Sequence, residues 1–258
     1  MPKLFAVLLL ISFSAVANTI NEQCPEHVLK GAPVTALPEN QTQYICKTNY
    51  AVHYRYDTKT AEYVAEHVTI DDISGPARRR DNFRADPDIP REHQSQLSDY
   101  AGSGYDRGHL AAGANNTANA QVMSESFFLS NMVPQNANHN RGIWRILETL
   151  VRNWVQDGKD IYVISGTIYQ EPYATIGENA VGVPSYLWKV IVDYRGQKGI
   201  AFVIPNRAVP VRELPQHAMT IREVEERTGL NFHPQLPAEL EHIEIEFDPL
   251  AWPGLVRD

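Results

Sequence analysis

A histidine that follows an Asp-Arg-Gly tripeptide is the first residue through which this chain could do chemistry. His109 ends the run Tyr-Asp-Arg-Gly-His over 105–109, after the glycine-containing stretch 102–104. An imidazole has an ordinary pKa of about 6.5, so at neutral pH it can accept a proton from water. Glycines beside it let the backbone approach a bulky substrate closely. Alone, such a run is weak evidence, because most histidines are ordinary surface or core residues.

Oxygen ligands for a hard cation occur further along the chain. Asn140 stands where the N-cap of a helix is expected, and a polar stripe at spacings of three or four follows it on that helix: Arg141, Arg145, Glu148 and Arg152. One interpretation is a solvated face with a Glu148–Arg152 ion pair, which would contribute only a few tenths of a kcal/mol. The other is a Mg²⁺ site, because Mg²⁺ keeps most of its waters and needs few amide or carboxylate oxygens besides substrate phosphate.

Arginines gather in one short segment of a chain that is acidic overall. The sequence has 23 Lys and Arg against 31 Asp and Glu, a formal net charge of -8, which excludes a protein that coats nucleic acid through its global charge. A local phosphate-binding site remains open, because guanidinium groups grip phosphate well. The alternative is a cluster balanced by aspartates. The arginines are Arg78, Arg79, Arg80, Arg84 and Arg91, and the aspartates are Asp81, Asp86 and Asp88.

The elements that must position these residues follow from hydrophobic periodicity. Helical spacing of apolar residues predicts a helix over 141–156 that Gly158 ends. Segment 71–98 is polar and predicted to be irregular, and Thr220 with Glu223 forms a capping box for a short helix that Gly229 ends. The predicted strands are a hairpin over 50–56 and 61–68, then 161–165, 186–192 and 200–204. Without a repeat or a linker, the chain is expected to form one α+β domain.

The first seventeen residues have the form of a secretory signal peptide. Lys3 precedes an apolar stretch over 4–13, and Ala15-Val16-Ala17 has the small-x-small pattern that signal peptidase cuts after. A membrane-spanning helix needs about 18 apolar residues, more than this stretch offers. We therefore expect cleavage after residue 17 and a secreted or periplasmic mature protein with no membrane segment.

Residues 18–48 form an N-terminal arm that holds the two cysteines of the chain, Cys24 and Cys46. An oxidising compartment favours their pairing. A catalytic thiol or a metal site would need more partners than these two residues show. We therefore expect a structural disulfide that ties down the arm.

Taken together, four motifs resemble the DNA/RNA non-specific endonucleases in both order and spacing. These motifs are 79–86 (Arg-Arg-Asp-Asn-Phe-Arg-Ala-Asp), 102–109 (ending in Asp-Arg-Gly-His), 129–135 (Leu-Ser-Asn-Met-Val-Pro-Gln) and 140–148 (Asn-Arg-Gly-Ile-Trp-Arg-Ile-Leu-Glu). The resemblance extends over nearly the whole of the expected mature chain. It implies an endonuclease domain over 49–258 with a ββα-metal fold, also called His-Me finger, in which helices flank a central antiparallel sheet.

The resemblance also implies a role for each matching residue. His109 corresponds to the general base, Asn140 to the direct Mg²⁺ ligand and Glu148 to the carboxylate that holds metal-bound water. Arg79 and Arg152 correspond to arginines that face the phosphate, with Arg79 preferred over Arg80 because it stands four residues before Phe83. Arg107 is expected to contact phosphate or to position its loop. Three further residues are expected to support the site from behind: Asp106, Asn131 and Gln135.

The function that this implies is Mg²⁺-dependent hydrolysis of DNA and RNA to 5'-phosphate products, with Mn²⁺ as a substitute ion. Contacts would be to phosphate, and a monomer and a homodimer both suit the fold. One alternative is a secreted nucleic-acid-binding or uptake protein on the same fold. A zinc hydrolase is disfavoured, because the sequence has no pair of histidines at helical ligand spacing.

Overall fold

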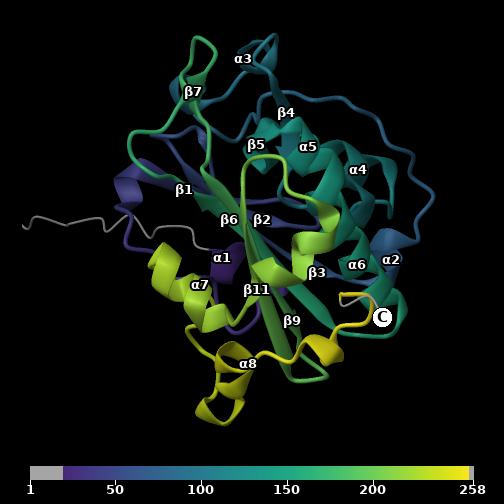
Figure 1. Cartoon of the computed structure of the whole chain (residues 1–258). Coiled ribbons are helices and arrows are strands. Elements are labelled where there is room, and N and C mark those ends of the chain that lie inside the picture. Colours follow the sequence, from purple (N-terminus) through teal and green to yellow (C-terminus); the bar gives the residue numbers. More distant parts are fainter. Residues whose placement is uncertain (1–19, 256–258) are drawn as a thin grey trace, which may run out of the picture.

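The computed structural model describes residues 20–255, so the expected signal peptide lies outside the described residues. A seven-stranded, wholly antiparallel sheet forms its centre (Figure 1). In spatial order the strands are β1 (Thr42–Cys46), β2 (Ala51–Arg55), β3 (Thr60–Val68), β6 (Ile161–Ile168), β9 (Tyr186–Asp193), β10 (Lys198–Pro205) and β11 (Ala218–Met219). The expected α+β class with a central antiparallel sheet is confirmed.

Two small sheets and a set of mostly short helices surround this centre. The small sheets are β4 (Tyr105–His109) with β5 (Met132–Asn136), and β7 (Thr175–Ile176) with β8 (Val181–Gly182). The helices are α1 (Ile20–Gln23), α2 (Ile70–Ile73), α3 (Leu97–Tyr100), α4 (Ala120–Glu125), α5 (Ala137–His139), α6 (Arg145–Gln156), α7 (Ile221–Thr228) and α8 (His242–Ile245). Within residues 20–255, no helix has the length and apolar character needed to cross a bilayer.

The longest departure of the chain from the central sheet lies between two neighbouring strands, and all the residues expected to do chemistry lie in this excursion. β3 and β6 pair along their length, from Tyr63 opposite Gly166 to Val68 opposite Ile161. Residues 69–160 therefore begin and end at adjacent points on the same sheet. They carry the irregular segment, the antiparallel pair β4–β5 and α6.

Each face of the sheet buries a separate apolar cluster. On one face α6 packs its apolar side, Leu147, Leu150, Val151 and Trp154, against side chains of β2, β3, β6, β9 and β10. On the other face α1, α7 and the segment around Phe232 cover Tyr63, Trp188 and Val190. The excursion thus packs on one face of the sheet. Helix α1 and the C-terminal helices α7 and α8 pack on the opposite face.

The helix predicted over 141–156 begins later than the apolar spacing suggested. A π-helical turn over Asn140–Trp144 precedes α6, and Gly142 has the non-helical angles φ -104°, ψ -108°. Asn140 has helical angles and is not an N-cap; Asn136 caps this region through Oδ1, which accepts from the backbone N–H groups of Asn138 and His139. The spacing of apolar residues continues through the kink, which is why periodicity alone misplaced the start.

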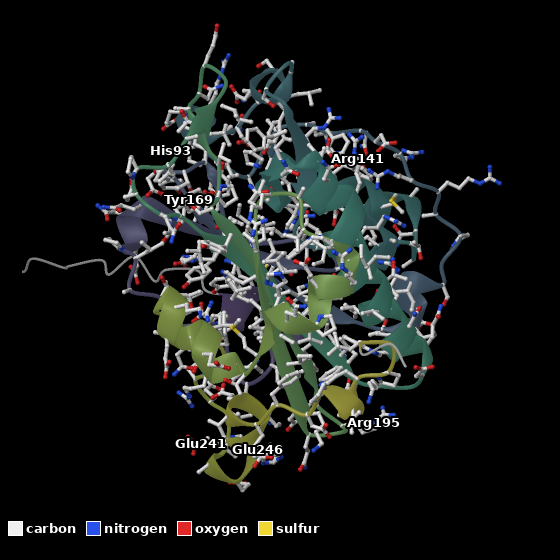
Figure 2. All side chains as sticks on the ribbon, viewed as in Figure 1. His93, Arg141, Tyr169, Arg195, Glu241 and Glu246 are labelled. Carbon is white, nitrogen blue, oxygen red and sulfur yellow. A yellow bond between two sulfur atoms is a disulfide. The ribbon has the colours of Figure 1, made fainter. Side chains whose placement is uncertain are left out.

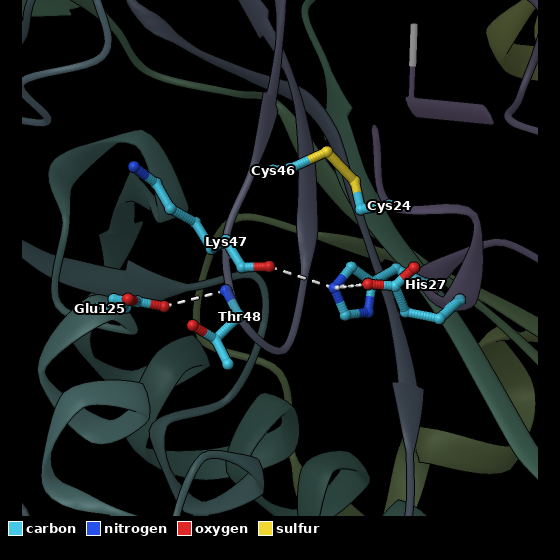
Figure 3. The surroundings of a disulfide bond; sticks show 7 residues. Cys24, His27, Cys46, Lys47, Thr48 and Glu125 are labelled. Carbon is cyan, nitrogen blue, oxygen red and sulfur yellow. Dashed lines mark hydrogen bonds and ion pairs between the residues drawn. A yellow bond between two sulfur atoms is a disulfide. The ribbon is translucent and has the colours of Figure 1, made fainter. Parts of the chain in front are cut away.

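The disulfide between Cys24 and Cys46 is present, with the two Cα atoms 6.0 Å apart. It joins Cys24, directly after α1, to the last residue of the edge strand β1, so both ends of the bond lie within the arm. Next to it, His27 Nε2 lies 3.1 Å from the carbonyl oxygen of Lys47, and the Thr48 N–H donates to Glu125 (Figure 3). The expected structural disulfide is confirmed, and it sits among contacts that connect the arm to the excursion.

Replacing both cysteines with serine is expected to lower the free energy of unfolding by about 2 to 3 kcal/mol. The disulfide closes a loop of some twenty residues in the unfolded chain and so lowers the conformational entropy of the unfolded state. Urea unfolding of the oxidised wild type and the double variant measures this loss. Dithiothreitol should destabilise the wild type to the level of the variant and leave the variant unchanged. Equal midpoints for all four samples would contradict the expectation.

Candidate active site

His109 lies at the end of β4 in a pocket of aromatic side chains. Its ring meets Phe83 and Phe127 edge to face, with centroid distances of 5.8 and 5.1 Å. Its carbonyl oxygen accepts a hydrogen bond from the indole nitrogen of Trp144, at 3.1 Å. Only 8% of the residue is exposed, and Nε2 is buried without a hydrogen-bond partner among the described residues. Nδ1 is therefore the ring nitrogen that water can reach.

Burial and, to a smaller extent, the nearby positive charge of Arg79 together lower the pKa of His109 to about 3. The imidazole is therefore neutral at physiological pH. A neutral ring with one solvent-facing nitrogen and no competing hydrogen bond is able to accept a proton.

This low pKa also makes a prediction about stability. Below pH 6.5 the unfolded chain binds a proton at residue 109 that the folded protein refuses, so the wild type loses stability as the pH falls toward 3. His109→Gln does not titrate. Its destabilisation relative to wild type should therefore shrink by about 2 kcal/mol between pH 7.5 and pH 5, as measured by urea unfolding. A destabilisation that is the same at both pH values would mean that His109 titrates normally.

Arg79 is the arginine of the cluster that reaches His109. A methyl group placed on Gly113 would lie 3.5 Å from His109 Nε2 and 3.7 Å from Arg79 Nη1, so both groups border the same point. The Arg79 guanidinium also lies over the ring of Phe127, at 5.0 Å, and its Nε donates to Asp81. Its side chain is still 57% exposed. The guanidinium is therefore exposed on the Nε2 side of the imidazole, where it can meet a phosphate.

The other charged residues of this segment decide between a phosphate-binding site and a cluster of arginines balanced by aspartates. Arg84 donates to the carbonyl oxygens of Asn82 and Ser124 and lies over Phe128, so its guanidinium supports the fold. Asp86 and Asp88 pair with Lys47 rather than with any arginine. Among the described residues, the aspartate-balanced cluster is thus realised only at Arg79 and Asp81. Arg78 and Arg80 are exposed.

Asn140 and Asp106 meet at the junction of β4 and the π-helical turn. Asn140 Nδ2 donates to Asp106 Oδ2 at 2.9 Å, and Arg141 donates to both carboxylate oxygens, Nε to Oδ2 at 2.8 Å and Nη2 to Oδ1 at 2.6 Å. Burial alone would raise the pKa of Asp106, but the hydrogen bonds from Arg141 and Asn140 lower it overall. The carboxylate is thus ionised and fixed, and the amide oxygen of Asn140 is left free.

The donor set fits a hard cation that is held by few protein atoms. Asn140 Oδ1 and the Glu148 carboxylate make no hydrogen bond to the described residues, and both are oxygen donors. Burial raises the pKa of Glu148, opposed by the charges of Lys189 and Arg152. Residues 20–255 contain no group of three or more His, Cys, Asp or Glu side chains that could hold a metal ion.

Arg152 does not pair with Glu148, although both are on α6. The guanidinium donates instead to Asn115 Oδ1 at 3.3 Å and to Thr149 Oγ1 at 3.1 Å. Asn115 in turn donates to both oxygens of Glu66, which is buried in β3. The Glu148–Arg152 ion pair that the spacing allowed is therefore not formed. The buried side-chain amide of Asn115 instead positions Arg152 by accepting its hydrogen bond.

Three buried polar residues beneath the site were missed by sequence reasoning: Glu66, Asn115 and Lys189. Burial raises the pKa of Glu66 to about 7, and Lys189 is 2% exposed, donating to Ser165 Oγ and to the carbonyl oxygen of Leu110. Both charged residues point to the α6 face of the sheet, between apolar neighbours at every second position. A charge at an inward-facing position of a strand was the pattern that could have revealed them.

The other expected site residues occupy different surroundings. Arg107 is exposed, with its guanidinium 4.3 Å from the centroid of Phe83. Asn131 is fully buried and bonds the backbone of Ala111 and Ser126, fixing the chain just after His109. Gln135 lies against Gly108, where any Cβ would come within 1.8 Å of its Oε1, and its Nε2 lies 2.6 Å from His139 Nδ1. Asp106, Asn131 and Gln135 thus all lie behind the groups that would meet a ligand.

Comparison with known proteins points to one family. The model of the DNA/RNA non-specific endonuclease family matches residues 32–239. The human mitochondrial nuclease EXOG is 35% identical over 218 residues, 78% of this chain and 59% of that protein. A nuclease of Nostoc sp. is 33% identical over 224 residues, 80% of each chain. This chain thus spans about three fifths of the mitochondrial relative and most of the bacterial one.

A solved structure gives the same result for the fold. A chain in the crystal structure of the EndoG/EndoGI complex superposes on this one with a TM-score of 0.70 at 29% identity. The match covers 76% of this chain and 88% of the other. The likeness in fold therefore covers about three quarters of this chain.

Proposed function

Because this chain belongs to the DNA/RNA non-specific endonuclease family, we propose that it is a Mg²⁺-dependent endonuclease that hydrolyses phosphodiester bonds in DNA and RNA. One observation carries the proposal. The neutral imidazole of His109, which has no hydrogen-bond partner among residues 20–255, lies beside the exposed guanidinium of Arg79, so a proton acceptor and a phosphate-binding group share one site.

In the proposed reaction His109 Nδ1 accepts a proton from the water that attacks phosphorus. Arg79 stabilises the negative charge that grows on the phosphate oxygens. Asn140 Oδ1 would hold Mg²⁺ directly and Glu148 would hold it through water; when bound, the ion supplies positive charge to the phosphate and the departing 3' oxygen. The products then carry a 5'-phosphate and a 3'-hydroxyl.

Substrate binding would also make His109 a stronger base. In the free protein burial and the charge of Arg79 keep the pKa of the imidazole low. A phosphate beside Arg79 adds negative charge to the site, and a nearby negative charge favours the protonated imidazole. The basicity of His109 would therefore increase when a substrate phosphate is bound.

Exposed arginines of the excursion offer a polyanion a local contact. Arg141, in the π-helical turn, is exposed and lies in the upper part of the molecule in Figure 2, whereas Arg195, Glu241 and Glu246 lie in its lower part. A chain with a net charge of -8 can bind nucleic acid through such a local group of arginines. We further propose that the protein acts outside the cytoplasm, which the disulfide favours because thiols oxidise there.

The substrate range is the test of this function. We expect the purified protein to cut DNA and RNA duplexes of the same sequence at rates within about tenfold of each other, because the site addresses phosphate and presents no element to base edges. Cleavage should stop with EDTA and resume with Mg²⁺ or Mn²⁺. RNA cut orders of magnitude more slowly would contradict recognition through phosphate alone. Binding without any cleavage would instead indicate a nucleic-acid-binding or uptake protein.

A further inference from the structure

The carboxylate of Asp106 orients the amide of Asn140. A carboxylate only accepts hydrogen bonds, so the atom of the Asn140 amide that faces Asp106 Oδ2 at 2.9 Å must be nitrogen. The carbonyl oxygen, the only atom of the amide that can bind a cation, then points the other way. A free amide could rotate by 180° and present nitrogen to the ion. The Asp106 contact therefore decides whether Asn140 is able to be a ligand.

Asp106 is in turn held by Arg141 through two parallel hydrogen bonds. The guanidinium donates to both carboxylate oxygens, at 2.8 and 2.6 Å, a fork geometry that fixes the carboxylate plane. The pair also joins two elements, since Asp106 is on β4 and Arg141 directly follows Asn140. The kink at Gly142 separates Arg141 from the α6 stripe to which the sequence assigned it.

We propose that Arg141 is a positioning residue for Asn140, which clamps the Asp106 carboxylate so that Asn140 Oδ1 stays turned toward the bound cation. The inference rests on the proposed function, in which Asn140 binds the metal. Arg141 itself touches neither the ion nor the attacked phosphorus; it acts through Asp106.

The sign of the expected effect separates this role from plain electrostatics. Arg141 carries a positive charge near a cation site, so by Coulomb's law its removal should strengthen metal binding. Positioning predicts the reverse, because loss of the clamp frees Asp106 and lets the Asn140 amide rotate. If a variant without the Arg141 charge binds the metal more weakly, the loss must come from the changed orientation of the Asn140 amide and not from electrostatics.

Arg145 provides a matched control one turn further along. It is exposed, carries the same charge and pairs with no carboxylate among residues 20–255, and its Nε donates to the carbonyl oxygen of Arg141. Its charge also acts on Glu148. Arg145→Ala therefore removes the charge without removing the clamp.

The experiment measures Mn²⁺ binding to the full mature chain without nucleic acid, by electron paramagnetic resonance, with Mg²⁺ as competitor. We expect Arg141→Ala to raise the Kd for Mn²⁺ about tenfold, within the range typical of residues behind metal ligands. Arg141→Lys, which cannot reach both oxygens, should give a smaller rise. Arg145→Ala should leave the Kd unchanged or lower it. Thermal unfolding of each variant within a few degrees of wild type shows that the fold is intact.

A double-variant cycle completes the test. In an Asp106→Ala background, adding Arg141→Ala should change the Kd by less than about twofold, since coupled residues are not additive. If Arg141→Ala leaves Mn²⁺ binding unchanged but raises the KM for nucleic acid, Arg141 is a phosphate contact and the inference is wrong. If Asn140→Ala itself does not weaken Mn²⁺ binding, the proposed metal site fails, which is a different result.

Discussion

Replacing His109 with alanine is expected to lower kcat by a factor of about 10² to 10⁴ while nucleic-acid binding stays within a few fold of wild type. The imidazole is the proton acceptor of the proposed reaction, whereas phosphate is gripped by Arg79 and the metal. Single-turnover cleavage of a labelled duplex measures the rate, and fluorescence anisotropy in the presence of Ca²⁺ measures binding.

Two controls make this result specific to the base. His67→Ala removes another imidazole, on β3 beside Asp160, without touching the site, and should leave kcat unchanged. Added imidazole should restore part of the activity of His109→Ala, because it can occupy the space between Phe83 and Phe127 and accept the proton. An alanine variant that cleaves at nearly the wild-type rate would show that another group activates water.

The second large effect is expected at the metal ligand. Asn140→Ala should raise the Mg²⁺ concentration at half-maximal activity by about 100-fold or more, above the range typical of residues that act behind ligands. Glu148→Gln should cause a smaller rise, because Glu148 is proposed to act through a water molecule. Magnesium titrations of cleavage at fixed substrate give both values.

Asn138→Ala is the matched control for this prediction. Asn138 is exposed, two residues before Asn140, and its side chain has no hydrogen bond to the described residues. It should behave as wild type. Equal shifts for Asn140→Ala and Glu148→Gln would contradict the assignment of one as a direct ligand and the other as an indirect one.

The strands of the central sheet were predictable where both faces are buried. The runs at 161–165, 186–192 and 200–204 are nearly continuous in apolar and β-prone residues, and each forms the greater part of β6, β9 or β10. The pattern of apolar residues did not predict β4 and β5 as strands. β4 reads Tyr-Asp-Arg-Gly-His, which has no alternation of apolar and polar residues, and it is a strand only because β5 pairs with it.

The candidate site was predictable at the residues that stand in short motifs and not at those that depend on tertiary contacts. His109, Asn140 and Glu148 lie in motifs that are contiguous in sequence. Glu66 and Lys189 reach the same region from strands far apart in the chain, and no local pattern connects them. The Arg141 side chain points to Asp106 because the helix is kinked at Gly142. The presence of a glycine in the sequence does not by itself predict this kink.

The position of the excursion within the sheet also bears on when, during synthesis of the chain, the proposed active site can form. On a ribosome the segment from Arg79 to Arg152 is made before β6, β9 and β10. The face on which α6 packs is built largely from those later strands, through residues such as Leu187, Ile191 and Phe202. Joining β3 to β6 across residues 69–160 costs about 4 kcal/mol of loop-closure entropy. The local contacts that an unfinished chain can form offset little of this cost. We therefore expect the growing polypeptide to carry the proposed catalytic side chains before the sheet that positions them has formed, so that the nucleic acids of its own ribosome would meet a completed site only after synthesis is nearly complete.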